Sequence, residues 1–392
     1  MASLPFPASL DPASGDAIHP YRLEVPQAAL DDLSARLARA RWPDRETVPD
    51  WSQGVPLDRM QALVGYWRES YDWRRCEAQV NQWPQFRTNI DGLGIHFLHI
   101  RSPHADALPM VLTHGWPGSF LEFLNVIGPL TDPTRHGGRA EDAFHLVIPS
   151  LPGYGLSDKP TAPGWNVERI ARAWGTLMQR LGYDRYVAQG GDWGSAVTRA
   201  MAVQRVPGLA GIHLNMVVVF PPEEEDFTDT EAQEARAAAD DHKQWGLGYS
   251  TQQSTRPQTL GYALADSPVG QAAWIYEKFH AWTDNDGEPE QALSRDAMLD
   301  MITLYWLTDS AASSARLYWE SFRSAFGNAA IALPVACSIF PHEMRRPPRR
   351  WAERVFSDII YWNRAAKGGH FAAFEQPDHF VAEVTAGLRG LR

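Results

Sequence analysis

The amino-acid sequence predicts an α/β fold in which helices cover both faces of a mostly parallel sheet. Along residues 86–220, short apolar runs typical of buried strands alternate with amphipathic segments of helical period. This alternation is the pattern of parallel sheets. One such run, Tyr186–Gln189, leads into a glycine-flanked turn and then into a helical stretch. Residues 221–328 are mainly helical in pattern, which predicts an inserted lid.

Residues 1–85 are predicted to form an N-terminal extension that wraps the core. After Tyr21–Val25, a helical stretch runs from Pro26 to Arg41, where leucines recur at helical spacing. A second helical stretch covers Leu57–Tyr71. The apolar face of this second helix consists of Met60, Leu63, Val64 and Trp67.

The core is predicted to have two parts, residues 86–220 and residues 329–392, on either side of the lid. Phe86–Ile90 and Ile95–Ile100 are expected to form a hairpin around the turn Asp91–Gly94. The remaining predicted strands are Met110–Thr113, Phe144–Pro149, Tyr186–Gln189, Ile212–Val218 and Leu333–Ile339.

The turn Gly190-Gly191-Asp192-Trp193-Gly194 has the spacing of a nucleophile elbow between a strand and a helix. Its glycines permit the strained backbone that lifts the central side chain clear of the sheet. A carboxylate that attacks a saturated carbon forms an ester, which water can cleave at the carbonyl, whereas a serine would form a stable ether. Asp192 therefore favours displacement at an epoxide or an alkyl halide through a covalent intermediate.

Composition indicates a soluble globular protein, with 44% hydrophobic and 21% charged residues among 392. No uninterrupted apolar run of membrane-spanning length occurs, and residues 1–19 lack the features of a signal peptide. The net charge of -11 argues against nucleic acid as a partner. Cys76 and Cys337 fit a reducing cytoplasm and lie outside any metal-ligand spacing. We therefore expect a cytoplasmic location, no metal and no cofactor.

Four motifs follow one another along the chain: His114–Pro117, Gly190–Gly194, Phe340–Glu343 and Gly368–Glu375. In this order they make the chain resemble the epoxide hydrolases of the α/β-hydrolase fold, of the microsomal and juvenile-hormone type. The segment from Tyr21 to Pro43 also resembles the N-terminal extension of that subgroup. The microsomal members carry an N-terminal membrane anchor, whereas this chain starts directly in polar sequence, so no membrane anchor is expected.

The resemblance implies a triad in the chain order nucleophile, acid, histidine. Asp192 would attack the epoxide carbon, and His370 would take a proton from the water that hydrolyses the ester. Glu343 would bond the other ring nitrogen of His370 and stabilise the imidazolium. The backbone N–H groups of Trp116 and Trp193 would form the oxyanion hole, with the Trp116–Pro117 peptide bond expected to be cis.

Two lid tyrosines would help the epoxide oxygen to leave, because an alkoxide needs a proton or a hydrogen bond. The family uses such a pair, and the segments Gly248–Ser250 and Ser314–Glu320 resemble its two tyrosine segments. They nominate Tyr249 and Tyr318. Three other tyrosines lie nearby in the sequence: Tyr262, Tyr276 and Tyr305.

The predicted reaction converts an epoxide and water to a vicinal diol. The sixteen tryptophans suggest a bulky or aromatic substrate. A role in natural-product biosynthesis, such as that of enediyne antibiotics, and a detoxifying role of broad specificity both stay open, as does a homodimer. The alternatives are a haloalkane dehalogenase, which halide release would reveal, and a non-catalytic binding protein, which the intact Asp-Glu-His set disfavours.

Overall fold

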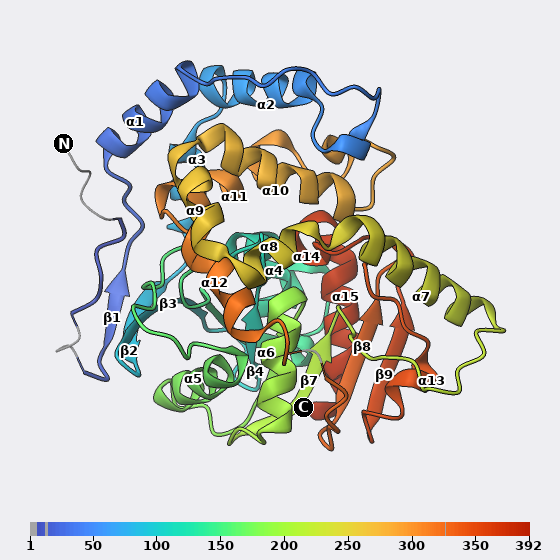
Figure 1. The fold of residues 1–392 in the computed structure, drawn as a ribbon. Coiled ribbons are helices and arrows are strands. Elements are labelled where there is room, and N and C mark those ends of the chain that lie inside the picture. The colour runs from blue at the N-terminus through green and yellow to red at the C-terminus, as the bar shows by residue number, and fades with distance from the viewer. Residues whose placement is uncertain (1–5, 12–14, 326) are drawn as a thin grey trace.

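A computed structural model describes residues 6–11, 15–325 and 327–392. Its centre is one nine-stranded sheet, in which the six strands β4 to β9 run parallel and β1, β2 and β3 add an antiparallel edge (Figure 1). The strand order across the sheet is β1 (Ile18–Tyr21), β2 (Gln85–Ile90), β3 (Leu93–Ile100), β5 (Phe144–Pro149), β4 (Leu108–Thr113), β6 (Tyr186–Gly190), β7 (Leu209–Leu214), β8 (Val335–Ile339) and β9 (Ile359–Arg364). The α/β-hydrolase fold expected from the sequence is confirmed.

The hairpin of β2 and β3 forms where the sequence predicts it, although its turn is shorter. The turn residues are Asp91 and Gly92, whose φ angles are 54° and 82°. Two consecutive positive φ angles define the type I′ turn that Asp-Gly favours, because its twist matches that of the strands. Leu93 and Gly94 consequently belong to β3 and pair with β2.

The strand predicted at 212–218 lies earlier in the chain, at Leu209–Leu214. The next residue, Asn215, lies outside the strand, and its side-chain oxygen accepts a hydrogen bond from the Gln189 side chain. The apolar residues Met216–Val219 follow the carboxyl end of this strand. They are buried but do not belong to the sheet.

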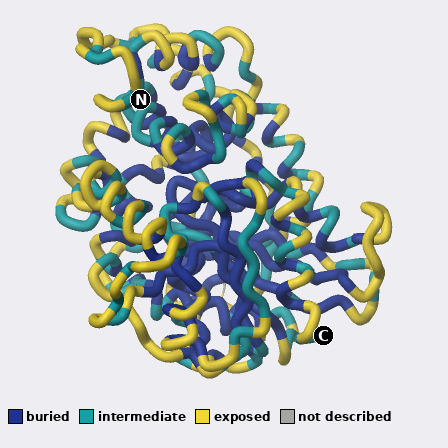
Figure 2. Tube along the Cα trace, turned by 90° about the vertical axis from the view of Figure 1, so that its right-hand side faces the viewer, coloured by how far each residue is buried: buried dark blue, intermediate teal, exposed yellow. Residues whose placement is uncertain are grey.

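Two pairs of helices cover the sheet, α5 (Val167–Arg180) with α6 (Asp192–Val203) and α4 (Leu124–Thr131) with α15 (Pro377–Leu388) (Figure 1). The parallel strands other than β9 are buried almost throughout (Figure 2). This burial on both faces explains why these strands read as continuous apolar runs in the sequence.

The lid covers one end of the sheet (Figure 1). Its helices are α7 (Thr230–Asp241), α8 (Gly248–Thr255), α9 (Pro257–Asp266), α10 (Pro268–Trp282), α11 (Arg295–Leu307) and α12 (Ala311–Ser321). A short π-helix, His242–Gly246, joins α7 to α8. The lid therefore lies over the loops that follow the central strands.

The N-terminal extension packs on the lid through α1 (Gln27–Ala38), α2 (Leu57–Glu69) and α3 (Trp73–Val80) (Figure 1). The apolar face predicted for the second helix is buried as expected. An ion pair of 2.6 Å joins Arg75 in α3 to Asp300 in α11, and the Tyr71 hydroxyl donates to the same carboxylate. The division of the chain at residues 85, 220 and 328 stays a prediction.

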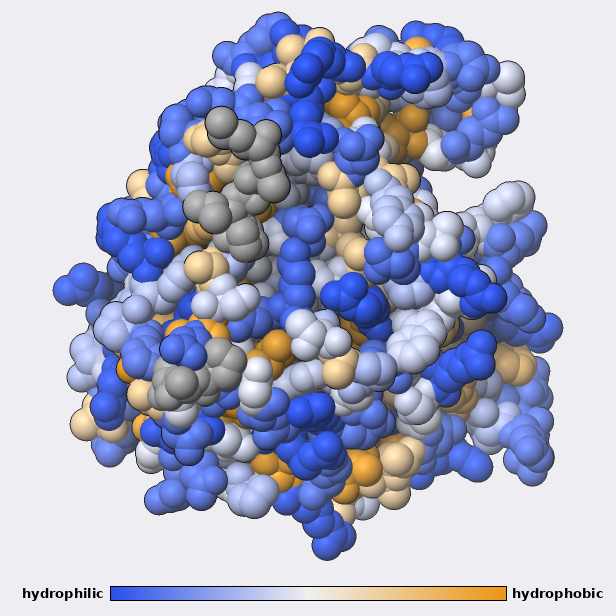
Figure 3. Space-filling model, turned by 60° about the vertical axis from the view of Figure 1, so that its left-hand side comes forward, coloured by the Kyte–Doolittle hydropathy of each residue, from blue (hydrophilic) through white to orange (hydrophobic). Residues whose placement is uncertain are grey.

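The face of the molecule seen in Figure 3 is mainly hydrophilic, with hydrophobic residues in small groups. Across the described ranges, no helix combines the length and the apolar character that crossing a bilayer requires.

Candidate active site

Asp192 lies at a turn that only glycine neighbours allow. β6 ends at Gly190 and α6 begins at Asp192, whose φ angle is 49°, an uncommon value for a residue other than glycine. A Cβ atom on Gly194 would lie 1.8 Å from the Thr113 carbonyl oxygen, and one on Gly190 would lie 2.1 Å from the Gly194 oxygen. The strained, glycine-flanked elbow predicted from the sequence is thus present, and it lifts the carboxylate above the end of the sheet.

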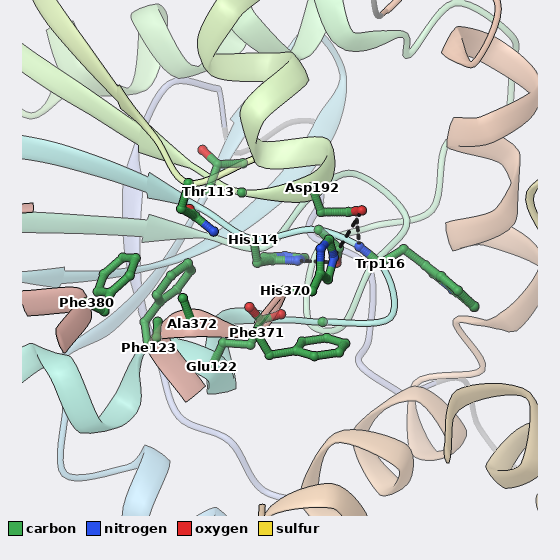
Figure 4. Close-up of a pocket in the computed structure, with 15 residues that line it drawn as sticks. Thr113, His114, Trp116, Glu122, Phe123, Asp192, His370, Phe371, Ala372 and Phe380 are labelled. Atoms are coloured by element: carbon green, nitrogen blue, oxygen red, sulfur yellow. Dashed lines mark hydrogen bonds and ion pairs between the residues drawn. The ribbon is translucent and has the colours of Figure 1, made fainter. Parts of the chain in front are cut away.

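His370 lies between two carboxylates, those of Glu343 and Asp192, and Figure 4 shows its contact with Asp192. Its Nδ1 lies 3.0 Å from Glu343 Oε2, and its Nε2 lies 3.4 Å from Asp192 Oδ2. Glu343 follows β8, and His370 follows β9 in a loop whose backbone is held by a hydrogen bond from His370 N–H to the Trp282 carbonyl of 2.8 Å. The structure therefore brings together the three residues that the sequence proposes as a triad.

The electrostatics of this cluster favour a charged imidazole. Burial alone would lower the pKa of His370, but the Glu343 charge and the hydrogen bonds to Asp192 and Glu343 raise it well above its ordinary value. Glu343 is completely buried, and the Met344 N–H donates to its Oε1 at 2.6 Å. The two carboxylates thus stabilise the charged form of the imidazole.

The loop after β4 contacts the other oxygen of Asp192. The Trp116 N–H donates to Asp192 Oδ1 at 2.7 Å, and a Cβ on Gly115 would lie 2.2 Å from that oxygen. The Trp116–Pro117 peptide bond is cis, as predicted. Trp193 follows Asp192 in the first turn of α6 and is buried, and its part in the oxyanion hole stays a prediction.

His114 holds the shape of this loop. Its Nδ1 donates to the Gly115 carbonyl at 3.0 Å and its Nε2 accepts from the Leu151 N–H at 3.1 Å. Burial lowers the pKa of His114 to about 4, so the ring is neutral. Both nitrogens are engaged by the backbone, as expected for a structural residue. Among the described residues, no group of three or more His, Cys, Asp or Glu side chains is arranged to hold a metal ion.

Tyr249 from α8 and Tyr318 from α12 enter the site from the lid. The Tyr249 ring stacks on Trp116 with centroids 4.9 Å apart, and Tyr318 meets Trp193 edge to face at 4.7 Å. Burial raises the pKa of both hydroxyls, and the Asp192 charge raises it further. The two hydroxyls influence each other, but the Tyr318 hydroxyl has no partner of hydrogen-bond geometry within the described part of the chain. It is a buried donor free to bond a substrate oxygen.

The other three lid tyrosines have different surroundings. Tyr262 is 71% exposed. The Tyr276 hydroxyl donates to Glu290, and the Tyr305 hydroxyl donates to the Gly118 carbonyl at 2.8 Å. The surroundings of these three tyrosines thus differ from those of Tyr249 and Tyr318, the pair that the sequence nominates.

A small cavity lies beside Asp192 and the ring of His370, and all the residues that line it come from outside the lid, so neither of these two tyrosines is among them (Figure 4). It leaves about 20 Å³ for the centres of water-sized molecules, which is enough for at least one water. Its polar lining includes a carboxyl group that sequence reasoning missed, that of Glu122 in the 3₁₀ turn Phe120–Phe123. The signal that could have found it is an acidic residue inside the apolar run Phe120–Leu124.

Comparisons with known proteins agree with the architecture. Residues 18–123 match the family described as epoxide hydrolase N terminus, and residues 109–377 match the family described as alpha/beta hydrolase fold. The two matches overlap and together span both the N-terminal extension and the sheet.

Three relatives illustrate the similarity. A Stigmatella aurantiaca (strain DW4/3-1) protein named "Putative epoxide hydrolase" is 62% identical over 377 residues, which cover 96% of this chain and 86% of that protein. Epoxide hydrolase 1 of Sus scrofa is 35% identical over 95% of this chain and 88% of its own length. The solved structure of Aspergillus niger epoxide hydrolase superposes with a TM-score of 0.87 at 32% identity, covering 98% of this chain and 99% of that chain.

Proposed function

Because this chain belongs to the epoxide hydrolases of the α/β-hydrolase fold, we propose that it opens its substrate by forming an ester on Asp192, which His370 and water then hydrolyse. The observation that carries this proposal is the placement of the two Asp192 oxygens. Oδ1 accepts from the Trp116 N–H, and Oδ2 faces His370 Nε2 at 3.4 Å. One oxygen is thus held by a backbone donor while the other is available for attack.

In the first step, Asp192 Oδ2 attacks an epoxide carbon and the ring C–O bond breaks. The epoxide oxygen takes a proton from a lid tyrosine, Tyr318 or Tyr249. Forming the ester removes the Asp192 charge, which is one of the causes that raise the pKa of His370. The imidazolium therefore becomes a stronger acid, and its proton returns to the tyrosinate. His370 is left neutral and able to act as a base.

In the second step, His370 Nε2 removes one proton from water while the hydroxide forms a bond to Asp192 Cγ. Negative charge develops on Oδ1, where the Trp116 N–H, and by our prediction that of Trp193, stabilises it. The bond from Cγ to Oδ2 then breaks, and the leaving diol oxygen takes the proton from His370. The regenerated carboxylic acid gives its proton back to the imidazole, which restores the starting state.

Oxygen isotope transfer tests this order of events. In H₂¹⁸O, with the enzyme in excess over a phenyl-substituted epoxide, the diol of the first turnover should contain no ¹⁸O. The peptide that contains Asp192 should instead gain one ¹⁸O atom, read by mass spectrometry. If the first diol carries the label and Asp192 does not, water attacks the epoxide directly and the ester mechanism is wrong.

We propose a bulky or aromatic epoxide as substrate, because aromatic rings surround the attack position. Trp116, Tyr249 and Tyr318 contact one another, and Trp282 meets Tyr249 at 5.2 Å. A panel of aliphatic and aryl epoxides measures this preference. A biosynthetic role predicts that kcat/KM is much higher for one epoxide than for all the others, whereas a detoxifying role predicts similar kcat/KM values across the panel. Haloalkanes in the same panel test for dehalogenation.

The cytoplasmic location and the homodimer remain part of the proposal. Both cysteines, Cys76 and Cys337, are free and buried, which suits a reducing compartment. Fractionation of the source cells tests the location, and light scattering of the purified protein tests the oligomeric state.

A further inference from the structure

The cavity beside His370 contains a carboxyl group that the proposed mechanism does not use. Glu122 lies in the turn Phe120–Phe123, between two buried phenylalanines, and its side chain extends into the cavity on the side of the His370 ring (Figure 4). Protein surrounds the side chain, while its oxygens stay accessible to a molecule inside the cavity. A carboxyl group in this position is costly unless something bonds it.

The surrounding protein does little to stabilise this group. Within the described ranges, no side chain donates a hydrogen bond to the Glu122 carboxyl or forms an ion pair with it, and the Ser119 N–H is the one donor that favours its charged form. Burial, helped by the charge of Asp192, raises the pKa of Glu122 to about 8, although His370 opposes this shift. An apolar residue would fill the space at a lower cost.

The loop that carries the oxyanion donor makes room for this carboxyl. A Cβ on Gly118 would lie 1.3 Å from Glu122 Oε1, so the carboxyl occupies the space that any side chain at position 118 would need. Three residues earlier, Gly115 lies against Asp192 in the same way. Two glycines of one loop thus admit the two carboxyl groups to the same cavity, which His370 also lines.

We propose that Glu122 is the positioning residue for the hydrolytic water, holding it between its own carboxyl, His370 Nε2 and the Cγ atom of Asp192. This inference rests on the ester mechanism proposed above and adds to it the source of the water. The water donates one hydrogen to His370 and the other to a Glu122 oxygen, an acceptor whether or not the carboxyl is protonated. These two bonds direct its lone pair at the ester carbonyl from the side opposite the lid.

A purely structural role for Glu122 predicts a different outcome. The loop has other supports, because the Tyr305 hydroxyl bonds the Gly118 carbonyl and the Ser119 hydroxyl bonds the Leu121 N–H. If Glu122 nevertheless shaped the loop, its loss would displace the Trp116 N–H from Asp192 and would slow ester formation too. A positioning role affects hydrolysis of the ester alone.

The experiment measures the two steps separately in a matched pair, Glu122→Leu and Glu122→Gln. The full chain, in excess over a phenyl-substituted epoxide, is quenched in acid at intervals, and mass spectrometry follows the Asp192 adduct as it forms and decays. In Glu122→Leu we expect formation within about twofold of the unsubstituted enzyme and decay slowed roughly tenfold to hundredfold. Glu122→Gln keeps an acceptor oxygen and should decay within about threefold of the unsubstituted rate.

Equal decay rates in all three proteins would overturn the proposal, as would equal slowing of both steps in Glu122→Leu. Appearance of ¹⁸O in the first-turnover diol would instead refute the ester itself, and the role of Glu122 with it.

A second variant displaces the carboxyl without removing it. The new methyl group in Gly118→Ala must push Glu122 aside, so decay of the adduct should slow in this protein as well. In Gly118→Ala/Glu122→Ala the methyl enters vacated space, and decay should be no slower than in Glu122→Ala alone. Additive slowing in the double variant would show that position 118 acts through the loop and would count against the proposal.

Discussion

The two sides of Asp192 differ in what they offer to a reaction. The lid side is aromatic and closely packed, with Tyr249 and Tyr318 among tryptophan rings. The sheet side holds a cavity of water size, in which the polar groups of His370 and Glu122 lie among phenylalanine and alanine side chains. One carboxylate with two unlike surroundings suits a reaction of two unlike steps, because opening an epoxide needs exclusion of water and hydrolysing an ester needs one placed water.

The largest expected effect comes from removing the group that both sides share. In Asp192→Ala neither step has a nucleophile or an ester, so turnover should fall by roughly 10⁴-fold or more and no adduct should form. In His370→Gln, Asp192 can still be alkylated, but the ester should persist. Mass spectrometry of the intact protein should then find it heavier by the mass of the substrate. Normal turnover by His370→Gln would contradict the two-sided mechanism.

A smaller effect, confined to the lid side, is expected from Tyr318→Phe. The variant loses the buried hydroxyl that has no other partner, so adduct formation should slow on the order of 10²–10⁴-fold while decay of the adduct is unchanged. Tyr276→Phe is the matched control, because that hydroxyl bonds Glu290 away from Asp192. If Tyr318→Phe slowed decay instead, the assignment of proton donation to the lid would be wrong.

The smallest effect concerns stability and reports on the sheet side alone. A glutamate that ionises near 4.5 when unfolded and at about 8 when folded binds more protons in the folded state between these values, so stability falls as the pH rises. The groups that interact with Glu122 are Asp192, His370 and Tyr305.

Glu122→Gln removes this loss of stability. Relative to the unsubstituted protein, the variant should gain about 2 kcal/mol between pH 5 and pH 9, less than the full shift implies because the carboxyl meets cavity water. Urea unfolding at a series of pH values measures the difference. A difference that does not change with pH would show that Glu122 ionises normally.

Sequence patterns predicted those parts of the structure that depend on local order. The elbow at Asp192, the hairpin at Asp91-Gly92 and the buried strands were predictable because glycine, turn residues and apolar runs act within a few positions. Two strands at the sheet edges were not predicted. β1 contains Pro20 and has only four residues, and β9 is only partly buried, so neither shows the apolar run of a central strand.

The candidate site also has parts that the sequence predicted and parts that it did not. The resemblance located the triad, the oxyanion loop and the lid tyrosines, each through a motif of its own. Glu122 belongs to none of these motifs. Its significance comes from the position of its carboxyl group, against Gly118 and inside the cavity, and only the folded chain defines that position. Likewise, no motif indicated that Tyr305 supports the loop through its hydrogen bond to the Gly118 carbonyl.

The backbone bond from His370 to Trp282 joins the base to the lid. Trp282 is the last residue of α10, and two residues later Asp284 accepts a hydrogen bond of 2.8 Å from the Gly368 N–H in the loop of the base. The lid is therefore not an exchangeable cover, because the path of its chain at residues 282–284 also sets the height of the imidazole above the sheet. A chimera that imports another lid to change substrate range would keep its catalytic alignment only if its chain followed the same path there.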